Sequence, residues 1–407
     1  MNRWLDRAML ALVVALAAAG LVVILSQPPA SRLSSDFTIN YSAGTLIREG
    51  QFAGPYRQPE LAAVMNRVAP GGAIDPRLPF SLPLAAGLPY AALSLLPLDL
   101  AFRLWELVSV GLLLVAVFLL QRAAPTLPSP RGGGNLEISL PRVQGRVRVG
   151  ALSMLGLLAA VPTWATLTEG QPTAWLALGG AMVMLALRSD SLALAAGAGA
   201  LLAVKPQYVP AYLAVLFAAR RWQSLVAAAV GAGLLLLSPL AGGVGGLMAM
   251  IHNALSANQA VAIRLNESWI GLIGPALPAS LASAVAIILY LGVLATLWLL
   301  AWRRPASRIG FAVLAGVLIV LASPHALPHD LLILAVPAWL AMVLHREDSL
   351  PNPLPGLLLI DLALLIDLHG VGLPLGPIVL TAVVAWYGWR FRQRAAQRRR
   401  QPIGRVA

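Results

Sequence analysis

The sequence has no cysteine and only one lysine, and its 407 residues carry few charges of either sign. Without cysteine there is no disulfide framework, no thiolate metal site and no cysteine nucleophile. Charged residues make up 11% of the chain, about half the share that is usual in a soluble globular protein. Because 59% of the residues are hydrophobic and the mean hydropathy is +0.79, the composition excludes a water-soluble enzyme.

Long apolar stretches recur along the chain from Leu10 to Trp389. They are too long for soluble strands or single core helices, and they are continuous rather than alternating, which excludes a membrane barrel. The sequence therefore predicts an all-α, polytopic transmembrane helical bundle of about 12 spans. The spans are expected near residues 8–26, 101–120, 150–165, 172–187, 192–204, 207–218, 222–240, 280–301, 309–322, 329–345, 354–368 and 374–390.

The apolar run from Leu78 to Pro97 contains four prolines, which favours a re-entrant or interfacial segment over a span. We expect residues 1–407 to form a single integral membrane domain. Its parts would be an outer active-site loop at 27–80 with the re-entrant segment continuing to about 97, a basic cytoplasmic loop at 121–149, and a basic cytoplasmic tail at 391–407.

Arginine is concentrated in the connections on one side of this bundle, which receive 21 of the 28 arginines. The positive-inside rule makes that side the cytoplasm and places both termini there. The net charge of +13 then indicates membrane topology and contact with anionic membrane lipids rather than nucleic acid. Most other polar residues fall on the opposite side, so we expect the chemistry on the outer face of the plasma membrane.

The outer loop begins a few residues after the first span with Ser34, Ser35 and Asp36. A carboxylate at this depth can take a proton from a sugar hydroxyl while a partner held in the lipid is attacked. The alternative is that Asp36 caps a helix that starts at Phe37.

A second polar cluster, from Ser323 to Asp330, lies between two strongly apolar spans. His325 and His329 can hydrogen-bond to a phosphate or neutralise it as cations, and Asp330 can orient an imidazole ring. A metal site is the competing interpretation because the histidines are four residues apart. Pro324 and Pro328 make a regular helix through them unfavourable.

The remaining outer turns supply a cation, amides and carboxylates. Lys205, followed by Pro206, can bind a phosphate as a point charge, or it can snorkel from a helix end. Glu169, Gln171 and Asn266 are of the residue types that bind sugars, although each can also be only part of a turn.

Two acids, Asp361 and Asp367, fall inside or near the end of an apolar span. Intramembrane carboxylates indicate proton coupling in a transporter, although a buried hydrogen bond would also account for them. The sequence has no phosphate-binding glycine loop, zinc-ligand spacing or serine-nucleophile motif. Glycines such as those at 197, 199, 231 and 233 are expected to be helix-packing contacts.

In order along the chain, these features resemble the polyprenyl-phosphate-mannose-dependent alpha-1,2-mannosyltransferases, glycosyltransferase family 87 of the C-type membrane glycosyltransferases. The segments that carry the resemblance are Asp36–Phe37, Tyr41–Ala43, Gly50–Tyr56, Leu96–Ala101, Trp105, Glu169–Gln171, Lys205–Pro206, Arg220–Trp222, Asn266–Ser268, Ser323–Pro324 and His329. The resemblance implies that Asp36 is the general base and that His329 is a second active-site residue. It also implies that no cofactor and no metal take part, because the first loop lacks an acidic pair.

We therefore expect an inverting glycosyltransferase that moves a sugar, with mannose as the expected one, from a polyprenyl-phosphate donor to a hydroxyl of a lipid or glycan acceptor. Positive charge and hydrogen bonds for the leaving phosphate would come from His325, His329, Lys205 and Arg264. The alternative function is a transporter or flippase of a lipid-linked saccharide that uses Asp361 and Asp367 for coupling. A structural subunit without activity is the third possibility.

Overall fold

The computed structural model describes residues 3–71, 74–75, 77–123, 156–260, 266–303, 305, 307–346, 352–368 and 375–400. All regular elements in these ranges are helical, so the predicted all-α class is confirmed for the part of the chain that is described. Arg264, most of the predicted basic loop at 121–149 and the last seven residues of the tail lie outside the described residues.

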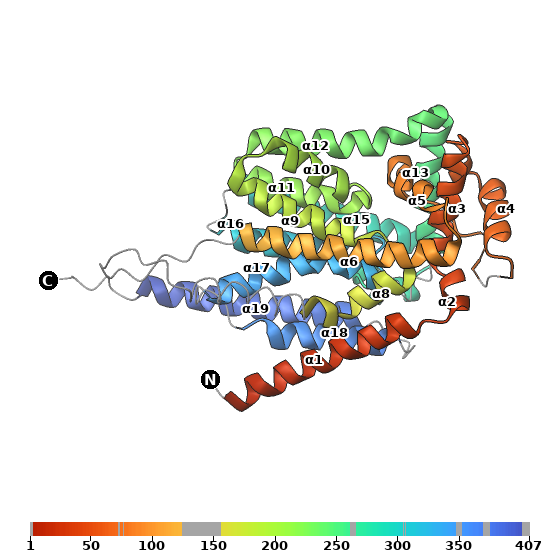
Figure 1. Ribbon diagram of the computed structural model, residues 1–407. Coiled ribbons are helices and arrows are strands. Elements are labelled where there is room, and N and C mark those ends of the chain that lie inside the picture. The colour runs from red at the N-terminus through yellow and green to blue at the C-terminus, as the bar shows by residue number, and fades with distance from the viewer. Residues whose placement is uncertain are drawn as a thin grey trace, which may run out of the picture.

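Most of the helices run side by side and form one bundle (Figure 1). They are α1 (Arg3–Ser26), α6 (Leu98–Ala123), α8 (Val161–Glu169), α9 (Thr173–Ser189), α10 (Leu192–Leu202), α11 (Val209–Ala218), α12 (Trp222–Leu237), α15 (Ala279–Trp302), α16 (Arg308–Ala322), α17 (Ala335–Arg346), α18 (Leu354–Leu368) and α19 (Leu375–Arg400). Most of them begin and end within a few residues of the predicted spans.

Shorter helices gather at one end of the bundle or link its members. They are α2 (Pro29–Leu33), α3 (Asp36–Arg48), η1 (Gly54–Tyr56), α4 (Gln58–Val68), η2 (Leu84–Gly87), α5 (Leu88–Leu93), η3 (Pro206–Tyr208), η4 (Ser238–Gly242), α13 (Gly243–Ala260), α14 (Trp269–Ile273), η6 (Gly274–Ala276) and η7 (Pro328–Leu334). The proline-rich run at 78–97 contains only η2 and α5. A six-residue helix is about 9 Å long and cannot cross a membrane.

Three helical stretches among the described residues are long and apolar enough to cross a membrane: Leu98–Ala123, Trp222–Leu255 and Ala279–Trp302. The second of them continues from α12 through η4 into α13. Other apolar helical stretches, among them residues 11–26 of α1, have 10 to 17 residues and by themselves fall short of the ~30 Å hydrocarbon layer. The chain is a membrane protein, and the number of 12 spans stays a prediction.

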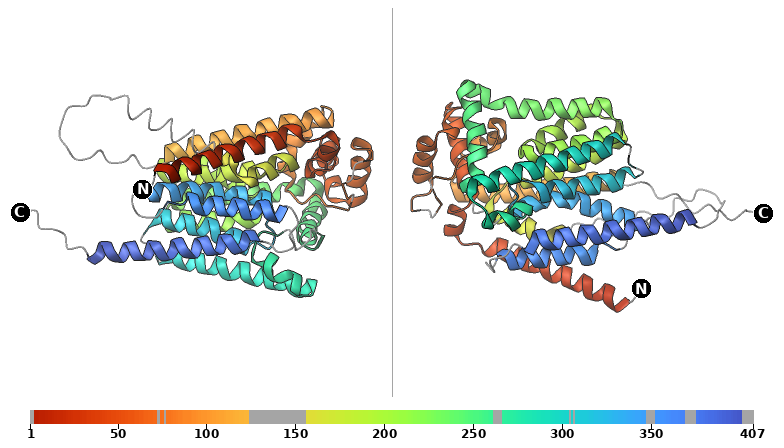
Figure 2. Two further views of the ribbon diagram at one scale, coloured as in Figure 1. Left: turned by 90° about the horizontal axis from the view of Figure 1, so that it is seen from below. Right: turned by 180° about the vertical axis from the view of Figure 1, so that it is seen from behind.

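The connection between the predicted spans at 222–240 and 280–301 is largely helical. It contains the 18-residue helix α13 and the short helices α14 and η6. Figure 2 shows α13 crossing the end of the bundle at a steep angle to α12. The change of direction falls at Gly243, directly after η4, since this residue has a φ of 79° that is open only to glycine at low cost.

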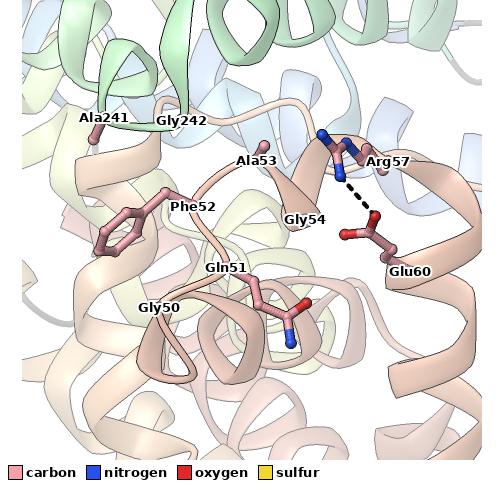
Figure 3. A pocket seen from close by; sticks show the side chains of 9 residues that line it. All are labelled: Gly50, Gln51, Phe52, Ala53, Gly54, Arg57, Glu60, Ala241 and Gly242. Carbon is pink, nitrogen blue, oxygen red and sulfur yellow. Dashed lines mark hydrogen bonds and ion pairs between the residues drawn. The ribbon is translucent and has the colours of Figure 1, made fainter.

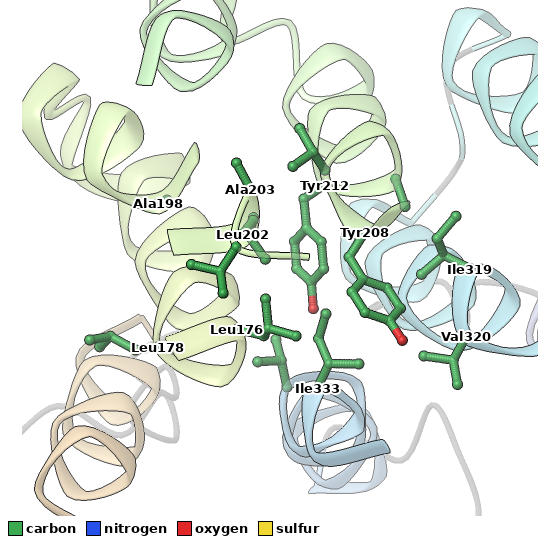
Figure 4. Close-up of a cluster of buried hydrophobic side chains, with 14 of the residues drawn as sticks. Leu176, Leu178, Ala198, Leu202, Ala203, Tyr208, Tyr212, Ile319, Val320 and Ile333 are labelled. Carbon is green, nitrogen blue, oxygen red and sulfur yellow. The ribbon is translucent and has the colours of Figure 1, made fainter. Parts of the chain in front are cut away.

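The largest hydrophobic core lies where α9, α10, α11, α16 and η7 meet (Figure 4). Leu176, Leu202, Tyr208 and Ile333 are each at most 2% exposed in it. Tyr208 lies three residues after Lys205, and Ile333 lies three residues after Asp330. Packing of these two side chains therefore fixes the backbone on which two of the predicted functional residues stand.

Two glycines allow α10 and α12 to touch at the backbone. A Cβ atom added to Gly199 would lie 1.9 Å from the carbonyl oxygen of Ala228, and one added to Gly231 would lie 2.0 Å from that of Ala196. The predicted packing role is thus confirmed for these two positions. It is wrong for Gly233, which has no atom within 4 Å of an added Cβ.

Arginines tie several helices together at the end of the bundle where α1 begins and α19 ends (Figures 1 and 2). Arg188 donates to the carbonyl oxygen of Ala123 at 3.0 Å, Arg220 donates to that of Trp302 at 3.1 Å, and Arg221 pairs with Asp190. We call this the arginine end. The opposite end, which carries α2 to α5, is the polar end.

We predict that the arginine end faces the cytoplasm and that the polar end faces outward. Single cysteines can be introduced into the Cys-free chain at the exposed positions Gln51 and Ser189, at opposite ends of the bundle. An impermeant thiol reagent should label the cysteine at 51 in intact cells and the one at 189 only after permeabilisation. The reverse pattern would contradict the topology, and the unmodified chain is the control for background labelling.

Candidate active site

Asp36 is the first residue of α3 and lies at the polar end of the bundle (Figure 1). The N-cap residue of this helix is Ser35, whose side chain makes no capping hydrogen bond. The carboxylate of Asp36 accepts a hydrogen bond from the side-chain amide of Gln171, a residue 135 positions away. Asp36 is therefore not merely a helix cap, because its carboxylate is directed to another part of the fold.

The turn from Glu169 to Gln171 positions Asp36 at two points. Its middle residue, Gly170, ends α8 with a φ of 63°, and a Cβ atom there would lie 2.5 Å from the Cβ of Phe37. Glycine is thus required both for the left-handed conformation and for the close packing. The backbone N–H of Asp36 hydrogen-bonds to the Glu169 carboxylate, while Gln171 holds the Asp36 carboxylate.

The surroundings of Asp36 bring its carboxyl group closer to the range of a useful base. Burial raises the pKa of Asp36 above its usual value, and the Gln171 hydrogen bond and the charge of Lys205 partly offset that rise. The charge of Asp330 raises it further. A general base works best when its pKa lies near the working pH, so these opposing effects suit the carboxylate for proton transfer.

Lys205 sits between α10 and η3, directly before Pro206. A proline restricts the residue before it to an extended conformation, and Lys205 has φ −125° and ψ 90°. From there its ammonium forms an ion pair with Asp330 and lies 3.3 Å from Nε2 of His329. The Lys205 side chain is 10% exposed and that of Asp330 is fully buried, so the lysine does not snorkel away from the protein.

Two prolines shape the segment from Ser323 to Asp330, as the sequence predicts. It has no regular helix before Pro328, where η7 begins. Asp330 accepts a 3.1 Å hydrogen bond from the Leu327 N–H on Oδ2 and the Lys205 ammonium on Oδ1. Within the residues that the structure describes, no three His, Asp or Glu side chains are grouped as metal ligands.

Burial and the neighbouring Lys205 ammonium determine which side chains in this cluster are charged. The imidazole of His329 lies 3.3 Å from the Lys205 ammonium in a buried site, where a second positive charge is unfavourable, so the ring is neutral. Asp330 is held as a carboxylate by its ion pair with the Lys205 ammonium and by the Leu327 N–H. An ammonium only donates, so Nε2 of His329 accepts and the ring hydrogen is on Nδ1.

Asn266 braces the histidine segment from the side. Its amide nitrogen donates to the carbonyl oxygen of Pro324 at 2.9 Å, and its amide oxygen accepts from the Ala326 N–H at 3.1 Å and from the Ser268 hydroxyl at 2.8 Å. These bonds use both lone pairs of the oxygen and one of two N–H groups. The structure thus gives Asn266 a positioning task, and its contact with substrate stays a prediction.

The remaining predicted residues take different places. Burial lowers the pKa of His325, and its carbonyl oxygen accepts from the Ser323 hydroxyl at 2.6 Å. The hydroxyl of Thr166, which the sequence analysis did not single out, lies 2.8 Å from the carbonyl oxygen of Pro162 and 3.3 Å from that of His329, and shares its one proton between them. No motif marks this threonine, because it stands inside an apolar helix.

The cavity shown in Figure 3 lies away from this cluster. It has a volume of about 440 Å³ and is lined by Gly50–Gly54, Arg57, Glu60, Ala241 and Gly242. Gly50 follows the C-terminus of α3, and the helix rises about 1.5 Å per residue. The cavity is therefore about 20 Å from Asp36 and separate from the predicted reaction centre.

We predict that Lys205→Met lowers the free energy of unfolding by about 3 to 5 kcal/mol, since it leaves a buried carboxylate unpaired. Asp330→Asn should also destabilise the protein, and the double variant should recover part of the sum of the two losses. Denaturant unfolding of the purified protein in detergent measures all three. The control is Arg77→Met at the exposed pair with Asp75, which should cost less than about 1 kcal/mol. Additive losses at 205 and 330 would contradict a buried ion pair.

Comparison with known proteins shows the family to which the chain belongs. No curated protein matches the chain at a significant level. The sequence model of glycosyltransferase family 87 matches residues 80–324. The match covers more than half of the chain and includes the Glu169–Gln171 turn and Lys205. The chain therefore belongs to glycosyltransferase family 87.

Proposed function

We propose that this chain is an inverting glycosyltransferase that moves mannose from a polyprenyl-phosphate donor to a hydroxyl of a lipid or glycan on the outer face of the plasma membrane. The observation that carries the proposal is that Asp36, whose carboxylate is held by a hydrogen bond from Gln171, lies near the buried ammonium of Lys205. Asp36 lies close enough to Lys205 and Asp330 for both charges to act on it. These residues come from three distant segments, and together they supply a base and a site for a phosphate.

Asp36 is the general base of the proposed reaction. The acceptor oxygen forms a bond to the anomeric carbon while the bond between that carbon and the phosphate oxygen breaks. The hydroxyl proton passes to the Asp36 carboxylate, and the polyprenyl phosphate leaves with the electron pair of the broken bond. Attack from the face opposite the phosphate inverts the anomeric carbon. Gln171 keeps the carboxylate in one orientation through its hydrogen bond, as base catalysis requires.

Lys205 and His329 stabilise the leaving phosphate. An ammonium has three N–H groups, of which one faces Asp330 and one faces His329 Nε2. The third is left for a phosphate oxygen, and the Nδ1–H of His329 is a second donor. Donors that are already fixed where negative charge develops are effective catalysts. Because His329 is neutral, this arrangement favours its hydrogen-bonding role over the cationic role.

The two intramembrane acids do not favour the transporter alternative. Asp361 accepts a 3.2 Å hydrogen bond from the backbone N–H of Val161, and Asp367 accepts bonds of 2.8 and 2.7 Å from those of Leu375 and Gly376. Both carboxylates thus cap the starts of helices, which satisfies backbone groups that have no partner within the helix. This is the structural role that the sequence left open for them.

Transfer and transport can be separated with purified protein in sealed vesicles. Radiolabelled polyprenyl-phosphate mannose is supplied together with a lipid or glycan acceptor. A new labelled product supports the enzyme. Unchanged donor that moves across the bilayer without product would overturn the proposal in favour of a flippase.

Asp36→Asn should reduce transfer by about 100 to 10,000-fold, which is the usual contribution of a general base. The variant should remain folded, since an asparagine can still accept the Gln171 hydrogen bond. Initial rates at saturating donor measure the loss. The matched control is Asp75→Asn, at an exposed carboxylate of the same loop, which should keep full activity. Near-normal turnover of Asp36→Asn would exclude this carboxylate as the base.

Gln171→Leu should move the acidic limb of the pH–rate profile to higher pH. The Gln171 hydrogen bond lowers the pKa of Asp36, so its loss raises that pKa and keeps the base protonated over a wider range. At low pH the variant should lose more activity than at high pH. Gln51→Leu, at an exposed position, is the control. A uniform loss at every pH would mean that Gln171 acts on geometry alone.

A further inference from the structure

A buried carboxyl group near the histidine segment takes no part in the proposed reaction. Glu267 is 2% exposed, and its Oε2 atom has no hydrogen-bond partner among the described residues. This oxygen lies against the start of α19, because a Cβ atom added to Gly376 would be 2.2 Å from it. A buried polar atom without a partner is costly, so a native structure that keeps one needs a reason.

The start of α19 already holds a second carboxylate. Asp367 accepts the backbone N–H groups of Leu375 and Gly376, the second of which belongs to the residue that Glu267 touches. Among the described groups, the charge that acts on Glu267 is that of Asp367. Two carboxylates this close in a poorly solvated site cannot both ionise at low cost. One of them must carry a proton, and Asp367 is the one stabilised as an anion by two N–H donors.

Glu267 is also part of the brace that holds the histidine segment. Its backbone N–H donates to the carbonyl oxygen of Ala326 at 2.6 Å. The neighbouring Asn266 holds Pro324 and Ala326 through its side chain. Residues 266–268 therefore lie between the start of α19 on one side and the segment that leads to His329 on the other. A shift of Glu267 away from Asp367 would be passed to that segment.

We propose that Glu267 is a positioning residue that holds the Ser323–Asp330 segment in its active arrangement only as the neutral acid. In the ionised form, repulsion from Asp367 displaces residues 266–268 and with them the backbone before His329. Burial raises the pKa of Glu267 to about 8, and Asp367 adds to the rise. The effect on catalysis rests on the proposed function, whereas the protonation of Glu267 does not.

The first test is the pH–rate profile of transfer. The wild type should lose activity above pH 8, by about tenfold for each pH unit. Glu267→Gln, which imitates the neutral acid, should keep near-normal activity at pH 7 and lack this alkaline loss. Asp367→Asn removes the charge that repels the ionised Glu267, so this variant should also lack the alkaline loss. An alkaline limb that is the same in all three proteins would overturn the proposal.

The second test needs no transfer activity. A carboxyl group whose pKa is raised by folding stabilises the folded state fully below its unfolded pKa, and that stability is lost as pH rises towards the folded pKa. The melting temperature of Glu267→Gln should therefore exceed that of the wild type by a margin that grows from pH 5 to pH 8. A constant difference, or a variant that is less stable at pH 7 than at pH 5 relative to the wild type, would show that Glu267 is ionised in the fold and would overturn the proposal.

The two tests separate the possible failures. Melting curves as expected, in a protein without transferase activity, would contradict the proposed function and leave the neutral Glu267 standing. If Glu267→Gln does not fold, Asp367→Asn decides, because the alkaline loss of activity needs the repulsion from Asp367 and should disappear without it. An alkaline limb that stays as in the wild type would count against the proposal.

Discussion

The buried ion pair between Lys205 and Asp330 is the interaction on which the polar end depends. Two charges taken out of water are costly, and their attraction compensates only when both are well placed and hydrogen-bonded. Asp330 meets this condition with Leu327 and Lys205 on its two oxygens. The pair thus fixes the junction between α10 and η3 against the start of η7, although these parts are 125 residues apart in the chain. It also settles the state of His329, because an imidazole beside a buried ammonium stays neutral.

The candidate site combines one cation, Lys205, with two carboxylates, Asp330 and Asp36. Asp330 neutralises Lys205 when the site is empty, so the lysine can be buried before any substrate binds. Asp36 feels the attraction of Lys205 and the repulsion of Asp330, and these effects oppose each other. Burial then decides the direction of its pKa, which is upward. In the proposed reaction, the phosphate of the donor gives the third N–H of Lys205 a partner and places another negative charge near Asp36, which makes Asp36 a stronger base when a proton must be removed.

The sequence predicts the helices well and their contacts poorly. Apolar runs and charged breaks locate α9 at 172–187, where the structure has Thr173–Ser189, since both depend on local hydropathy. The helix α13 is missed because its glycines and polar C-terminal half hide the apolar pattern. Asp36, Lys205 and His329 are found by residue type at span ends. Their partners are not, because the bond from Gln171 to Asp36 joins residues 135 apart and only the packing of the Glu169–Gln171 turn against the start of α3 brings them together.

The prolines and the glycine at the polar end place several of the proposed functional side chains at helix ends. These prolines and this glycine are Pro206 after Lys205, Pro328 before His329, and Gly170 between Glu169 and Gln171. Helix ends expose backbone groups that need partners, and Asp330 and Asp367 supply them in addition to their other contacts. A polar group that completes a helix end and also acts on a neighbour cannot be replaced without disturbing both. This coupling explains why the end of an otherwise apolar bundle is built from so few charges, each with several partners.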